Sequence, residues 1–142
     1  MGAMIALLLA AALQTAAPAA PTGLGAIGQQ HLPAKGCAAY LWNPADRQLV
    51  AMATADPATL RIAVGGKTID LARSGGGAAA ALGFAEATDY VGGDLHVRLA
   101  MTIVQQDGLT AGARVPQASL QVDRPGQDAL VLPVAGLVGC RS

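Results

Sequence analysis

The sequence predicts an all-β domain, either a small antiparallel β-barrel or a β-sandwich of about six to eight strands. Short runs of alternating apolar and polar residues recur along the chain, and this period of two is typical of half-buried strands. Two Gly-Gly pairs stand between such runs, as they do in tight hairpins. Turn-forming residues follow at intervals of about ten residues, which is a usual spacing in sandwiches and barrels.

The chain of 142 residues divides into three parts. Residues 1–19 are interpreted as a cleaved signal peptide, because an apolar run at 5–13 precedes the small residues Ala17-Pro18-Ala19. An uncleaved anchor is the alternative, but Gln14 and the prolines after it interrupt the run. Residues 20–36, rich in Gly and Pro, are expected to form a flexible linker. Residues 37–142 form the single β-domain of a periplasmic or secreted protein with no transmembrane segment.

The charge balance and the aromatic content of the chain argue against a nucleic-acid partner. Lys plus Arg and Asp plus Glu balance at nine each, and charged residues make up only 13% of the chain. Such a chain lacks the basic surface that binds a phosphate backbone. It also has only four aromatic residues, too few for stacking on single strands. We therefore expect no nucleic-acid partner.

The first strand is expected at residues 37–42 and the second at 48–53, separated by an Asn-Pro turn at 43–46. Tyr40 and Trp42 alternate along the first strand and so share one face. We expect them in the core, with a contact site as the alternative.

The clearest local pattern surrounds Gly65-Gly66. Residues 60–64 and 68–71 alternate on either side of this pair, which predicts a two-residue hairpin. The register opposes Ile62 to Ile69 on the buried face, and it opposes Arg61 to Asp70 on the solvent face as an ion pair.

A second hairpin is predicted at Gly92-Gly93, with its return strand at residues 95–103. This register places Asp89 opposite His96. It also turns Glu86 inward, so the outgoing strand either bulges or begins later. The Ala-rich run at 77–82 is expected to be a flexible connection with a short helix at best.

The last two strands are expected at residues 118–123 and 129–138. Pro116 indicates an edge or a bulge, and Pro133 does the same in the last strand. Cys37 and Cys140 are the only cysteines, and in an exported protein they predict a disulfide, with two independent thiols as the alternative. The first and last strands should therefore be neighbours that close the sheet.

Two places could carry chemistry. Asp89, Asp94, His96 and Arg98 form a polar cluster on the second hairpin. It could orient a general base or supply three metal ligands, but ordinary cross-strand pairing gives the same pattern. The glycines at 74–77 lack the Lys and Ser or Thr of a phosphate loop. The sequence predicts no cofactor, no metal and no catalytic residue.

The layout resembles that of the periplasmic inhibitors of C-type lysozyme. The resemblance consists of a signal peptide, a small antiparallel barrel, and cysteines on the first strand and near the end. Ser74-Gly75 echoes the Ser-Gly of that family's loop, whereas the next Tyr is Tyr90, so no inhibitory residue is carried over.

The leading hypothesis is an exported non-enzymatic domain that binds a protein or another envelope component. A lysozyme-inhibitor-like protein is one alternative. A small hydrolase or metal-dependent enzyme that uses His96 with Asp89 and Asp94 is the other.

Overall fold

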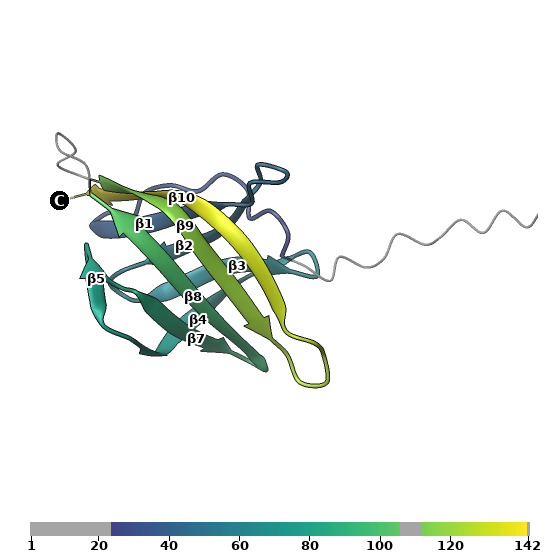
Figure 1. Ribbon diagram of the computed structural model, residues 1–142. Coiled ribbons are helices and arrows are strands. Elements are labelled where there is room, and N and C mark those ends of the chain that lie inside the picture. Colours follow the sequence, from purple (N-terminus) through teal and green to yellow (C-terminus); the bar gives the residue numbers. More distant parts are fainter. Residues whose placement is uncertain (1–23, 106–111, 142) are drawn as a thin grey trace, which may run out of the picture.

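The protein folds into a closed antiparallel β-barrel of eight strands, as the sequence predicts. The computed structural model describes residues 24–105 and 112–141. The expected signal peptide and residues 106–111 lie outside these ranges. Figure 1 shows β8, β9 and β10 crossing one side of the barrel as long tilted strands, with β5 standing beside them. The described residues contain no helix.

The strands follow one another around the barrel in the order β1, β10, β9, β8, β7, β4, β3, β2, and β5 and β6 form a separate small hairpin. Their bounds are β1 (Gly36–Trp42), β2 (Leu49–Thr54), β3 (Thr59–Val64), β4 (Lys67–Gly76), β5 (Ala79–Ala81), β6 (Phe84–Ala85), β7 (Ala87–Gly92), β8 (Leu95–Val104), β9 (Gly112–Asp123) and β10 (Leu130–Arg141).

The interior of the barrel is filled with side chains. Alternate residues of each strand point inward, as the pleat requires, and a barrel of eight strands is just wide enough for them to meet. The largest fully buried side chains are Tyr90, Leu41, Leu60, Ile62, Leu71, Leu99, Leu120, Val50, Val97 and Val115. The interior is therefore the core of the fold.

The first hairpin has the predicted register. Gly65 and Gly66 both adopt positive φ, at 59° and 80°, which is the requirement of a type I′ turn. Arg61 pairs with Asp70 across the strands, and its Nε donates to Asp70 Oδ1 over 2.8 Å. The register is well determined because a slip by one residue would turn the apolar set into solvent.

The second hairpin differs from its prediction by one residue. The turn is Gly93-Asp94, and Gly92 pairs with Leu95. Gly93 has φ of 57° and Asp94 has no positive φ, which suits a type II′ turn with Gly first. Asp89 is therefore opposite Arg98, and its predicted pairing with His96 is wrong. β7 begins only at Ala87, so Glu86 is not forced inward.

The predicted closure of the sheet is confirmed. β1 pairs with β10 along its whole length, and Cys37 lies directly opposite Cys140, to which it is disulfide-bonded. Gly136 allows the two strands to approach closely, since a Cβ there would overlap the carbonyl oxygen of Tyr40. The disulfide thus joins the strands that complete the barrel.

The aromatic face of β1 points outward: Tyr40 is buried as expected, but in a second apolar cluster outside the barrel interior, where Trp42 is only partly buried. Ala39 and Leu41 belong to the barrel interior. Tyr40 joins Ile27 and Met52 in a smaller apolar cluster on the outer surface, with Trp42 packed against it. Residues 24–30, inside the expected linker, lie over this cluster, because the buried side chain of Ile27 finds apolar partners there.

The Ala-rich run, expected to be a flexible connection with a short helix at best, forms strands instead. Ala79–Ala81 and Phe84–Ala85 pair as the hairpin of β5 and β6. Leu82 and Gly83 form its turn with positive φ of 54° and 85°. Phe84 is buried in the barrel core, which anchors the hairpin beside the strands of the barrel.

Candidate functional site

The predicted polar cluster lies on the outer face of β7, β8 and β9. His96 is directly opposite Asp123 of β9, and its Nδ1 lies 3.6 Å from Asp123 Oδ2. Its Nε2 lies 3.4 Å from Asp89 Oδ1, and Arg98 Nη1 lies 3.6 Å from the same oxygen. Asp94 lies in the turn and makes no ion pair with this group among the described residues. The second carboxylate beside His96 is therefore that of Asp123, and not that of Asp94 as the sequence suggested.

Asp89 Oδ1 is the most enclosed atom of this group. It has no hydrogen bond of good geometry among the described residues. The Arg98 guanidinium and the His96 ring stand within 3.6 Å of it, and Arg98 compensates its charge through an ion pair of loose geometry. His96 and Arg98 are about half exposed, and such pairs contribute little to stability.

The two ring nitrogens of His96 determine what this cluster can do chemically. Both ring nitrogens of His96 face carboxylates, so neither is directed at a nucleophile. Within residues 24–105 and 112–141, no three His, Cys, Asp or Glu side chains are placed to hold a metal ion. The arrangement is that of ordinary cross-strand charge pairing on a sheet surface.

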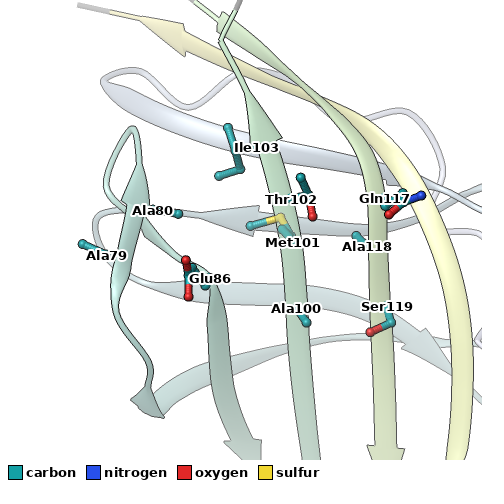
Figure 2. A pocket seen from close by; sticks show the side chains of 10 residues that line it. All are labelled: Ala79, Ala80, Glu86, Ala100, Met101, Thr102, Ile103, Gln117, Ala118 and Ser119. Carbon is teal, nitrogen blue, oxygen red and sulfur yellow. The ribbon is translucent and has the colours of Figure 1, made fainter.

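A groove of about 690 Å³ lies between the β5–β6 hairpin and the barrel wall. Figure 2 shows its lining side chains, with Ala80 and Glu86 between β5 and β8. The polar lining consists of Glu86, Thr102, Gln117 and Ser119. Glu86 is exposed, so the groove offers a carboxylate among small and apolar side chains.

One wall of this groove is an open strand edge. β7 pairs with β8 only as far as Ala100, while β8 continues to Val104. The N–H of Met101 donates to Glu86 O over 2.9 Å. Backbone groups of alternate residues point to the same side of a strand, so the N–H and C=O of Ile103 also point away from β9. No described strand pairs with β8 there.

β8 remains regular at this edge because the local irregularity belongs to β9. Between Thr102 and Val104, β9 advances from Gln117 to Arg114, so the extra residue is on β9. The pairing with β10 shows the same extra residue. It lies beside Pro116, where the sequence predicted an edge or a bulge. The open edge at Ile103 thus keeps the straight geometry to which another strand can pair.

A second cavity, of about 470 Å³, lies on the outer face of β1. Its floor is formed by Tyr40 and Trp42, whose ring centroids are 6.4 Å apart. Leu137 of β10 forms the opposite rim with 47% of its surface exposed. Burial raises the pKa of the Tyr40 hydroxyl, and nearby Arg141 acts in the opposite sense. We call this the Tyr40–Trp42 pocket.

The other wall of the Tyr40–Trp42 pocket comes from residues 26–30. Ile27 N–H donates to Leu49 O over 2.8 Å, and Gly25 N–H donates to Ala63 O over 3.0 Å. Arg61 Nη1 donates to Gln30 Oε1 over 2.7 Å. The first hairpin therefore holds this wall in place through Arg61, whose side chain also pairs with Asp70.

Comparison with known protein families, curated proteins and solved structures found no match. No helix in the part of the chain that the structure describes is long and apolar enough to cross a membrane.

Proposed function

We propose that this protein is an exported, non-enzymatic binding domain, periplasmic or secreted, that pairs an extended segment of a partner protein with the open edge of β8. The observation that carries the proposal is the backbone of Ile103, which no strand among the described residues pairs and which faces the groove beside β5. An extended peptide gains main-chain hydrogen bonds by adding a strand to such an edge. The disulfide is consistent with an oxidising compartment.

A second open edge, on β10, is protected in a way that supports this proposal. β1 pairs with β10 only from Ala135 onward, and Pro133 occupies the part of β10 beyond it. Proteins commonly protect exposed edges with proline, which cannot donate a backbone hydrogen bond. The edge at Ile103 has no such protection and faces a groove wide enough for a side chain. Glu86 in that groove favours a partner segment that carries Lys or Arg.

The test uses protein recovered after export in a bacterial host and a phage-displayed library of random peptides. We expect the selected peptides to be basic, and a labelled copy to bind with measurable fluorescence anisotropy. Ile103→Pro removes the edge N–H and should weaken binding at least tenfold, while Ile103→Ala keeps that N–H and should bind nearly as well. Glu86→Gln should weaken the basic peptides selectively.

Circular dichroism and thermal unfolding will check that both Ile103 variants are folded. The bonds to β9 are made by Thr102 and Val104, so Ile103→Pro should leave them intact. Equal peptide binding by wild type and a folded Ile103→Pro variant would contradict edge pairing. Edge pairing would also be contradicted if the library yielded no peptide that binds the protein above the background of a support without protein.

Inhibition of a C-type lysozyme is the second candidate function. The disulfide between the first and last strands of a closed barrel agrees with the resemblance to that inhibitor class. Turnover of cell-wall substrate by lysozyme should then fall in the presence of the protein. Full lysozyme activity at high molar excess of the protein would remove this candidate.

A further inference from the structure

We propose that the Tyr40–Trp42 pocket is a separate binding site for a small, neutral, apolar molecule that carries a flat ring. Its volume of about 470 Å³ lies in the range of small-molecule sites. The proposal is independent of strand pairing at β8, because Tyr40 and Trp42 are on β1 and share no lining residue with the groove at Ile103.

The lining determines the chemistry of the ligand. Ala26, Leu49 and Leu137 surround the two aromatic rings, and the remaining side chains are the amides of Gln29, Gln30 and Gln48. No charged residue lines the pocket. Arg61 and Arg141 stand near the pocket but outside its lining, so a charged ligand would lose its hydration without a charged lining group to replace it. A flat ring, by contrast, can pack against Trp42. Gln29 and Gln48 can each donate or accept one hydrogen bond from a polar group of the ligand.

The shape of the pocket favours a small molecule over a protein partner. Residues 26–30 rise beside β1 as a wall, and that wall is bonded to Leu49, Ala63 and Arg61. Gln30 Nε2 also donates to Ile27 O over 3.0 Å, which fixes the wall internally. A concave site that exists before binding is characteristic of small-ligand pockets, while protein interfaces bury a broader surface. The structure thus supplies a preformed wall, an aromatic floor and an apolar rim.

Two matched probes test the requirement for neutrality. N-phenyl-1-naphthylamine is uncharged, and 8-anilinonaphthalene-1-sulfonate has the same rings with an added sulfonate. Both dyes become fluorescent in apolar surroundings. We expect saturable binding of the neutral dye, at least tenfold weaker binding of the sulfonate, and energy transfer from Trp42, the only tryptophan of the chain.

Two substitutions on β10 test the location. Leu137→Arg places a cation at the rim and should weaken binding of the neutral dye at least tenfold. Val131→Arg makes the same kind of change on the same strand at a residue that is 61% exposed and outside the pocket, and it should leave binding unchanged. Ile103→Pro should also leave it unchanged, which separates this site from the groove.

Three results would overturn the proposal. The first is dye emission that does not saturate or shows no energy transfer from Trp42. The second is equal affinity for the neutral dye and the sulfonate, since the pocket would then not select neutral ligands. The third is equal weakening by Leu137→Arg and Val131→Arg, which would assign the binding to general surface charge.

Discussion

Replacement of Gly136 by alanine should open the barrel at its closure. The added Cβ would overlap the carbonyl oxygen of Tyr40 and would lie 2.9 Å from its carbonyl carbon. An ordinary carbon–carbon contact is about 3.5 Å, so that carbon alone must recede by about 0.6 Å and the oxygen by more. Both obstructing atoms are backbone, so no side-chain rotation relieves the overlap.

The energetic consequence follows from the pairing around this residue. Gly136 is opposite Leu41, with Tyr40–Leu137 and Trp42–Ala135 pairs on either side. Separation of the strands weakens about two ladder hydrogen bonds at roughly 1 kcal/mol each, and overpacking of a well-packed site adds about 1–3 kcal/mol. We therefore expect Gly136→Ala to lower the free energy of unfolding by about 3–5 kcal/mol.

The control is Gly139→Ala on the same strand. A Cβ there would meet Leu32 Cδ2 at 3.0 Å, and that atom is the end of a flexible side chain that can move. We expect a loss below about 1 kcal/mol, typical of a tolerated surface change. Urea unfolding followed by Trp42 fluorescence and by circular dichroism measures both variants. Equal midpoints for the two variants would refute the close approach of β1 and β10 at Gly136.

Three further predictions concern the covalent and ionic links. The double variant Cys37→Ser, Cys140→Ser should lower the free energy of unfolding by about 2–5 kcal/mol, because the disulfide closes a loop of 103 residues. Calorimetry of the double variant will measure this loss, and an unchanged melting temperature would contradict the prediction. The hydrogen bond from Arg61 lowers the pKa of Asp70, so the ion pair stabilises the fold above the unfolded pKa of about 3.9 and this contribution is lost as the pH falls through the lower folded pKa. Asp70→Asn should therefore cost up to about 1 kcal/mol at neutral pH, since both side chains are largely exposed, and the difference should shrink in urea titrations as the pH falls below about 3.9; a difference that does not decrease in acid would contradict this. His96→Ala should change stability by less than about 1 kcal/mol because its pairs are long and exposed, and a larger loss in urea titration would mean that the cluster is structurally essential.

The sequence predicted the fold well where local chemistry determines the structure. Gly65-Gly66 determines its turn and hence the whole register of the first hairpin. At the second hairpin three candidate turn residues, Gly92, Gly93 and Asp94, are adjacent, and two registers keep the same faces inward. The packing of the strands determines which of the two registers forms, so the local sequence pattern could not predict it.

The candidate sites were harder to predict because they depend on contacts between distant segments. Asp123 meets His96 only through the pairing of β8 with β9, and the sequence contains no two-residue turn motif that would predict that register. The outward placement of Tyr40 could not be inferred because both faces of β1 are apolar. Alternation alone shows that Tyr40 and Trp42 share a face and does not show which face points inward.

The places where ligands can bind follow from the way this barrel is filled. Large side chains such as Tyr90, Leu99 and Leu120 occupy the interior, so recognition is left to the outer surface. One opening arises because β8 is longer than the β7 segment that pairs with it, which leaves Ile103 without a strand on that side. The other arises because β1 is apolar on both faces, and the segment at 24–30 covers only part of the outward one. The difference in length between β8 and its partner β7 favours binding of an extended peptide, whereas the partly covered aromatic face of β1 favours a ligand with a small ring. The Ile103 and Leu137 variants test these two consequences separately.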